Sequence, residues 1–204
     1  MATLNINNFK KMFASAATEI TGVEKDLCAL DAVCGDGDHG TAIKGAINAA
    51  SDAIQSASDL KNGLMDAGFA AMSNSNGSTS TLFGSFLMGI SDGIDDGATE
   101  LDGTALGKAF ESGLNAVRAN TQANVGDKTL MDALIPGINA MHGKADAKDA
   151  MNAGAIAADE GAKSTLNYQA KFGRARNLGE KSIGSLDAGA TSMAIIFQTF
   201  AKSI

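Results

Sequence analysis

Residues 7–30 read NNFKKMFASAATEITGVEKDLCAL, and apolar side chains recur through this stretch at every third or fourth position. This spacing places them on one face of an α-helix. Asn7 or Asn8 is available to cap the start of that helix. The segment therefore predicts an amphipathic helix with one face against a core. The apolar stripe consists of Phe9, Phe13, Ala16, Ile20, Val23, Leu27 and Leu30.

The same periodicity returns in seven further segments. Pro136 falls inside the sixth predicted helix and should kink it or mark its boundary. Because no segment alternates with a period of two, we expect no sheet. The chain thus predicts an all-α fold of eight helices in one domain over residues 1–204. The further helices begin near Gly40, Asp59, Ser80, Asp102 and Asp127 or Thr129, and the last two span residues 148–166 and 190–201.

The composition argues against several classes of protein. The formal net charge of the 204 residues is −7 and no basic block occurs, which argues against nucleic acid or an anionic membrane as partner. No stretch reaches the roughly 18 apolar residues of a membrane span. Two cysteines, Cys28 and Cys34, are too few for a disulfide framework, and the first residues lack the apolar segment of a signal peptide. We therefore expect a cytoplasmic protein.

The order of the helices predicts where the loops meet. Short loops favour antiparallel neighbours, so every second loop falls at the same end of the domain. Four such loops carry the acidic cluster, a Gly/Ser/Thr/Asn run, a Gly-Asp-Lys-Thr turn and a segment with Arg174 and Arg176. The sequence therefore gathers its candidate chemistry at one end. These loops are residues 29–39, 73–80, 120–129 and 168–189.

The sharpest local signal is the acidic cluster of Asp31, Asp36 and Asp38. Glycines around the last two allow the loop to fold back so that the three carboxylates converge. Hard carboxylate oxygens suit Mg²⁺, which usually also takes oxygens from water and phosphate. The next helix starts at residues 39–42, where free backbone amides favour phosphate. The alternative at this point is a solvated acidic turn.

Other motif matches fail on their context. Residues 35–40 satisfy G-x-G-x-x-G, but a helix rather than a strand precedes them, which argues against a dinucleotide fold. Residues 89–93 satisfy G-x-S-x-G, but the hydrolase elbow also needs a strand before its serine. A hydrolase using Ser91 is therefore a remote alternative. For His39 we expect a ligand-orienting or nucleotide-contacting role.

Three separated motifs, in the same order, resemble the L subunit family of dihydroxyacetone kinase, the nucleotide-binding component. They are LDAVCGDGDHGT at residues 30–41, VGDKTLMDALIP at 125–136 and YQAKFGRARNLGEKSIGSLDAGATS at 168–192. The resemblance implies a closed barrel of eight antiparallel helices with the nucleotide at one end. It further implies two Mg²⁺ ions that join Asp31, Asp36 and Asp38 to the phosphates of ADP or ATP.

The resemblance also implies the remaining contacts to the nucleotide. Phosphate would be contacted at the starts of two helices, the adenine would be flanked by two residues, and Arg174 with residues 187–189 would close the site. These residues are His39, Gly40, Thr41, Ala42, Ser78 and Thr79 for phosphate, Thr121 and Leu130 for adenine, and Arg174, Asp187, Ala188 and Gly189 for closure.

In this family the acceptor ketose is held by a separate K subunit, so the resemblance implies a kinase that is active only with partners. A phosphodonor subunit is implied where phosphoenolpyruvate recharges the nucleotide. Whether the chain forms a homodimer is not decided by the sequence. Two departures from the family pattern favour a second hypothesis. Residues Asn76 to Ser80 replace a glycine-rich segment, and Ala188 replaces a proline. That alternative is a divergent nucleotide-binding regulatory module without transfer activity.

Overall fold

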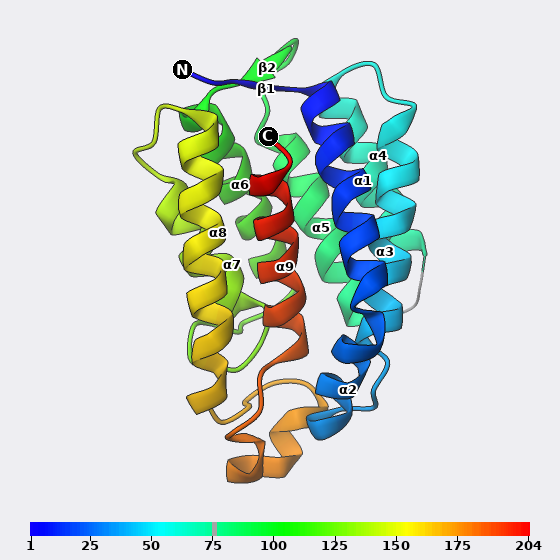
Figure 1. Cartoon of the computed structure of the whole chain (residues 1–204), viewed down its shortest axis with the longest axis vertical. Helices are drawn as coiled ribbons and strands as arrows, with labels where there is room; N and C mark the ends of the chain where they lie inside the picture. Colours follow the sequence, from blue (N-terminus) through cyan, green and yellow to red (C-terminus); the bar gives the residue numbers. More distant parts are fainter. Residues whose placement is uncertain (75–76) are drawn as a thin grey trace.

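The computed structural model describes residues 1–74 and 77–204, and most of them are helical (Figure 1). The helices are α1 Ile6–Gly22, α2 Glu24–Cys34, α3 His39–Gln55, α4 Leu60–Ser73, α5 Ser78–Asp92, α6 Gly103–Arg118, α7 Met131–Met141, α8 Ala147–Ser164 and α9 Ala188–Lys202, with the 3-10 helices η1 Thr165–Asn167 and η2 Arg174–Ser182. The all-α prediction is confirmed.

The first predicted helix is in fact two helices. It breaks at Val23, directly after Gly22, a residue with low helix propensity. The prediction of its cap was also wrong, because α1 begins at Ile6 and its cap is Asn5. The Asn5 side chain accepts from the amides of Asn7 and Asn8, and the Asn8 side chain accepts from the Asn5 amide, which completes a reciprocal capping box.

The expectation of no sheet was wrong as well. Strand β1, Leu4–Asn5, pairs antiparallel with β2, Glu100–Leu101, so that Leu4 lies opposite Leu101. Two residues are too short to show an alternating pattern, and both leucines are buried and join the core. Pro136 lies within α7, which starts at Met131 instead of at Asp127 or Thr129.

The helices form a ring. Each of α3 to α8 packs against the next, α9 packs against α8, and α9 also packs against α1, which in turn packs against α3 (Figure 1). The interior is filled by apolar side chains, among them Phe86, Phe110 and Phe197, whose rings meet edge-to-face or stacked at centroid distances of 5.7 to 6.5 Å. A closed ring leaves the two ends as the places where loops can build a site.

Glycine allows neighbouring helices to approach closely. A Cβ added to Gly84 of α5 would lie 2.6 Å from the carbonyl oxygen of Gly68 in α4, and one on Gly68 would lie 2.8 Å from that of Gly84. No real Cβ tolerates such a contact, so these two positions require glycine. Close helix packing of this kind accounts for some of the 24 glycines of the chain.

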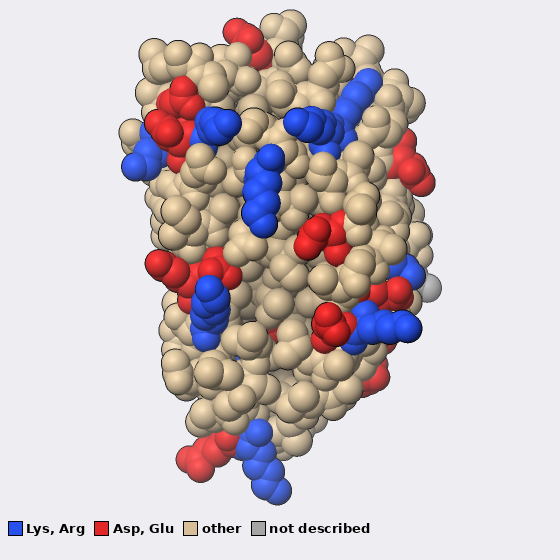
Figure 2. Space-filling view, in the orientation of Figure 1, with Lys and Arg blue, Asp and Glu red and all other residues tan. Residues whose placement is uncertain are grey.

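Within the described residues, no helix is both long enough and apolar enough to cross a membrane. Lysine and arginine side chains are scattered among aspartate and glutamate on the face drawn in Figure 2.

Candidate functional site

The loops that carry the candidate residues meet at one end of the ring, as predicted from helix order. Figure 1 shows the α2–α3 connection, the start of α5, the α6–α7 connection and the segment around η2 at the same lower end. Both chain termini and the β1–β2 pair lie at the opposite end. Asn76, the first residue of the departure at residues 76–80, lies outside the described residues.

The three aspartates converge. Asp31 lies in α2 and the other two lie in the turn before α3, and each offers a carboxylate oxygen within 4.8 Å of the others. Asp31 Oδ2 accepts hydrogen bonds from the amides of Gly37, at 2.8 Å, and Asp38, at 3.1 Å. Gly37 has a φ of +77°, and a side chain at Gly35 would collide with Asp31 Oδ1. The glycines therefore bring the carboxylates together, and a set of hard oxygen donors fits Mg²⁺.

Arg174 lies at this cluster. Its guanidinium forms an ion pair with Asp36, and both side chains are exposed. Arg174 begins η2, on the long segment between α8 and α9 that packs against α2. The structure thus brings together Asp36 and Arg174, which are 138 positions apart in the sequence.

The start of α3 faces the same place. Asp38 is its N-cap residue but makes no capping hydrogen bond with its side chain. The amide of Ala42 donates to Asp38 O, so the amides that precede the helical ladder are those of residues 39–41. The Thr41 hydroxyl donates to Glu24 Oε1 at 3.1 Å, and Gly40 packs tightly on the α2 backbone. The side chain of Thr41 therefore faces α2, whereas its backbone belongs to the helix start.

His39 ties three helix starts together. Its Nδ1 lies 3.2 Å from Thr79 Oγ1 in α5, and its Nε2 lies 2.9 Å from Ser192 Oγ in α9. Burial lowers the pKa of His39 to about 4, although the charge of Asp31 acts to raise it. At neutral pH the imidazole is therefore uncharged. Ser192 was not among the predicted site residues, because no local pattern marks a serine inside a helix.

The start of α9 completes this end. The Asp187 side chain caps the helix by accepting from the Ala190 amide at 2.7 Å, and Ala188 is buried as the first helical residue. A Cβ on Gly189 would lie 3.4 Å from the Leu130 Cβ, so these two predicted residues are neighbours. Burial raises the pKa of Asp187 to about 7, with the nearby charges of Asp132 and Asp31 acting in the same direction.

Sequence reasoning missed Lys128, although it singled out the turn that contains it. Lys128 is only 3% exposed and its ammonium donates to the carbonyl oxygens of Thr165, at 2.7 Å, and Ser185. Burial lowers the pKa of this lysine. Because lysine is rarely buried, nothing in the local sequence marks this one as an interior residue. Lys128 instead fastens the segment that leads from α8 to α9 over the site.

Thr121 lies in a separate cleft of about 460 Å³ with Arg118, Gln122 and Phe172 among its lining residues. Its hydroxyl accepts from the Ala123 amide at 3.2 Å. The cleft is bounded by the end of α6 and by the segment before η2. It is thus built from two of the four loops gathered at this end.

Comparison with known proteins identifies the family to which the chain belongs. Residues 33–202 match the DAK2 domain family. The chain is 34% identical to the ADP-binding subunit DhaL of the PEP-dependent dihydroxyacetone kinase 2 of Listeria innocua, over 89% of each protein. It is also 34% identical to L-erythrulose 1-kinase of Mycolicibacterium smegmatis, over 89% of this chain and 33% of that enzyme. The chain spans about a third of the erythrulose kinases that it matches.

The fold has a solved counterpart. The crystal structure of the dihydroxyacetone kinase from C. freundii in complex with AMP-PNP and Mg²⁺ matches with a TM-score of 0.76. The match covers 96% of this chain and 33% of that one at 24% sequence identity, which establishes similarity of fold. With the helical ring, the convergent aspartates and the matched residues together, the chain belongs to the DAK2 domain family and is of the DhaL type.

Proposed function

We propose that residues 1–204 act as one domain, the nucleotide-carrying and phosphoryl-transferring subunit of a kinase for dihydroxyacetone or a related ketose. The observation that carries the proposal is the meeting of Asp31, Asp36 and Asp38 with the start of α3. Carboxylates alone would repel each other and would repel phosphate, so this combination is stable chiefly when divalent cations and polyphosphate are bound together. The names of the relatives support the same reading, since one is an ADP-binding subunit.

In this proposal each group has a defined task. The three aspartates hold two Mg²⁺ ions, which supply positive charge to the phosphates of ADP or ATP. The amides of residues 39–41 and of Ser78 and Thr79 then donate to phosphate oxygens. Arg174 lies beside the cluster and contributes the further cation that a developing charge at the transferred group requires. Thr121 and Leu130 flank the adenine, and residues 187–189 close the site.

The acceptor must be presented by another polypeptide, a ketose-binding K subunit, in the cytoplasm. Large apolar side chains are exposed on the segments around the site, which is typical of a surface that meets a partner. The mention of phosphoenolpyruvate in the relatives' names supports a further phosphodonor subunit that recharges the nucleotide in place. The exposed residues are Val33, Val125, Leu166, Leu178 and Ile183.

Native mass spectrometry of the purified chain tests the binding step. We expect a mass increase equal to one ADP and two Mg²⁺, either as purified or after addition of both. Asp36→Ala should lose this adduct, whereas Asp102→Ala, which changes an aspartate at the opposite end, should keep it. An unmodified mass in millimolar Mg²⁺ and ADP would overturn the proposal.

Transfer is tested separately. The loaded chain is mixed with a dihydroxyacetone-binding K subunit and either dihydroxyacetone or erythrulose, and the sugar phosphate is followed by ³¹P NMR. Product formation that depends on this chain supports the kinase. Tight nucleotide binding without any product, with either ketose and with ATP supplied, would instead identify the regulatory module.

A further inference from the structure

A chain of hydrogen bonds runs from the backbone of α9 through His39 to α5. Ser192 Oγ lies 3.0 Å from Gly189 O and 2.9 Å from His39 Nε2. His39 Nδ1 in turn lies 3.2 Å from Thr79 Oγ1. Ser192 is 1% exposed, so its contacts are made inside the protein. Ser192 and His39 are therefore each held by contacts on both sides.

The first link determines the direction of the others. A carbonyl oxygen can only accept, so the Ser192 hydroxyl donates its proton to Gly189 O. Towards His39 the same hydroxyl must accept, and Nε2 therefore carries the hydrogen. Both ring nitrogens of His39 contact neutral hydroxyls, and no carboxylate of the described residues forms an ion pair with the ring, so the ring is neutral and its other nitrogen is an acceptor. It follows that the Thr79 hydroxyl donates to Nδ1.

The direction decides what Thr79 offers to a ligand. With its single proton directed to Nδ1, Oγ1 of Thr79 presents only lone pairs to its remaining surroundings. Such an oxygen can bind a cation or accept from water on a cation, but it cannot donate to a phosphate. Thr79 is half-buried beside His39, and His39 directly follows Asp38 of the aspartate cluster.

We infer that Ser192 is a positioning residue, which holds His39 in the Nε2–H form and thereby makes the Thr79 hydroxyl an acceptor on the cation side of the site. The inference rests on the proposed nucleotide site for its consequence, but not for the hydrogen-bond chain itself. It changes one assignment made from the family resemblance, because Thr79 then meets phosphate through its backbone amide and meets the cation or its water through its hydroxyl.

The tautomer is measurable because the chain has only two histidines, His39 and His142. Long-range ¹H–¹⁵N correlation spectra of the imidazoles, with His142→Gln for assignment, should show His39 in the wild type with a protonated Nε2 and an unprotonated Nδ1. Ser192→Ala should give a mixture of tautomers, and Ser192→Thr, which restores a hydroxyl, should restore the single form. A protonated Nδ1 in the wild type would overturn the inference even if every variant failed to fold.

The consequence is measured as Mg²⁺ affinity at saturating ADP. Thr79→Val and Ser192→Ala should each weaken the apparent affinity for Mg²⁺ about fivefold to tenfold, the usual effect of one lost polar contact. Thr79→Ser and Ser192→Thr should stay within about twofold. Unchanged Mg²⁺ affinity in Thr79→Val would remove the role assigned to the hydroxyl. A wild type that binds no nucleotide at all would defeat the proposed function, yet its imidazole spectrum would still test the tautomer.

Discussion

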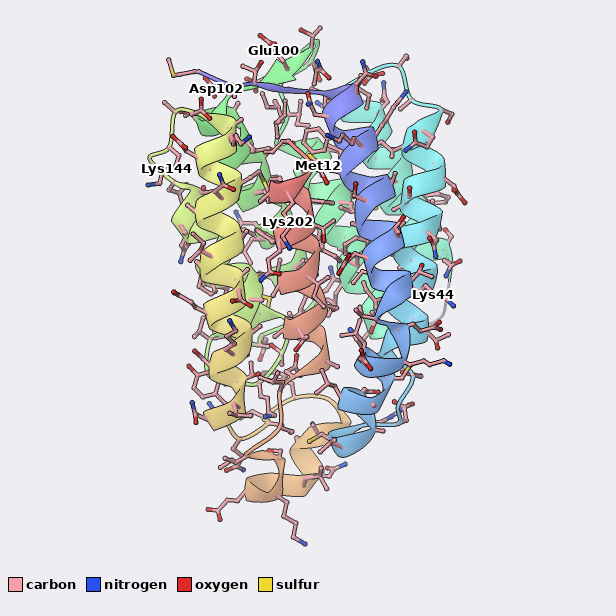
Figure 3. The ribbon with its side chains drawn as sticks, viewed as in Figure 1. Met12, Lys44, Glu100, Asp102, Lys144 and Lys202 are labelled. Atoms are coloured by element: carbon pink, nitrogen blue, oxygen red, sulfur yellow. The ribbon has the colours of Figure 1, made fainter. Side chains whose placement is uncertain are left out.

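The two ends of the helical ring start their helices differently. At the end with the chain termini, every helix start has a side chain that accepts from the first amides, namely Asn5 for α1, Asp59 for α4, Asp102 for α6 and Asp146 for α8. At the other end Asp187 caps α9 and the Thr129 hydroxyl accepts from the Met131 amide at the start of α7, whereas the N-cap residues of α3 and α5 make no such bond among the described residues. Figure 3 places Glu100, Asp102 and Lys144 at the capped end.

This difference assigns the stability of the helix starts to one end of the ring and ligand binding to the other. A side-chain cap satisfies amides that would otherwise lack a partner and contributes about 1 kcal/mol to the helix. Amides without such a cap remain available to an anion, and the helix dipole favours negative charge beside them. The caps at the first end therefore stabilise the fold. The uncapped end, which also carries the converging aspartates, is the place where a ligand replaces the caps.

The largest expected effect is on binding at the uncapped end. Asp36→Ala should weaken Mg²⁺–ADP binding by about a hundredfold or more, which corresponds to roughly 3 kcal/mol. Stability should hardly change, because the ion pair that is lost with Arg174 is exposed. Isothermal titration calorimetry measures the affinity, and circular dichroism measures the helix content. A loss of helix would show that Asp36 is a structural residue.

Lys128→Met tests whether a buried lysine at the uncapped end stabilises the fold more than an exposed one does. It leaves the buried carbonyls of Thr165 and Ser185 without their donor, and we expect a loss of about 2–3 kcal/mol in the free energy of unfolding by urea. Lys171→Met is the matched control, since Lys171 is exposed and pairs with Asp127 at the surface. That control should lose less than about 1 kcal/mol. Equal losses in the two variants would contradict a fastening role for Lys128.

The caps of the two ends should respond to pH in opposite directions. Burial raises the pKa of Asp187 to about 7, so the folded protein holds a proton that the unfolded chain releases near pH 4. This contribution to stability is complete below about pH 4 and is lost as the pH rises to about 7. We expect Asp187→Asn to remove a decline on the order of 2 kcal/mol across that window. Urea unfolding of both proteins from pH 4 to 8, without nucleotide, gives the difference.

Asp59 provides the opposite case. Hydrogen bonds from the backbone and side chain of Asn62 lower the pKa of Asp59, so its stabilising effect is present above about pH 4 and is lost on acidification. Asp59→Asn should therefore flatten the decline in stability below about pH 4, where Asp187→Asn has little effect. A decline of the same sign for both aspartates would break the contrast between the two ends.

The smallest effect is expected at the capped end. Asp102→Ala removes the hydrogen bond from the Ala105 amide and should cost about 1 kcal/mol in unfolding free energy. Its affinity for Mg²⁺–ADP should stay that of the wild type, measured by the same titration as for Asp36→Ala. Weaker nucleotide binding in this variant would show that the ends are not independent.

The sequence was sufficient for the helical class and for the end at which the site lies. Both follow from regular features, the apolar spacing and the alternation of helix direction, which local physics controls. The break at Val23 and the short pairing of β1 with β2 were not predictable, because each depends on contacts between distant segments. The predicted helix starts near Asp59 and Asp102 were confirmed, and both aspartates cap their helices, since an N-cap bond joins residues that are close in the chain.

The candidate site was predictable only in part for the same reason. Asp31, Asp36 and Asp38 are close in sequence, and their convergence needed only a turn that contains glycines. The contacts of His39 with Ser192 and of Lys128 with Ser185 span 153 and 57 residues, so they exist only once the ring has closed. Nothing in the local sequence distinguishes those serines from surface serines.

Hydrogen exchange measured by mass spectrometry, with and without Mg²⁺–ADP, tests the contrast between the two ends most directly. The account predicts slower exchange of the amides at the starts of α3 and α5 when the ligand is present, and no change at the starts of α4, α6 and α8. Protection at the capped helix starts, or no protection at residues 39–41, would contradict it.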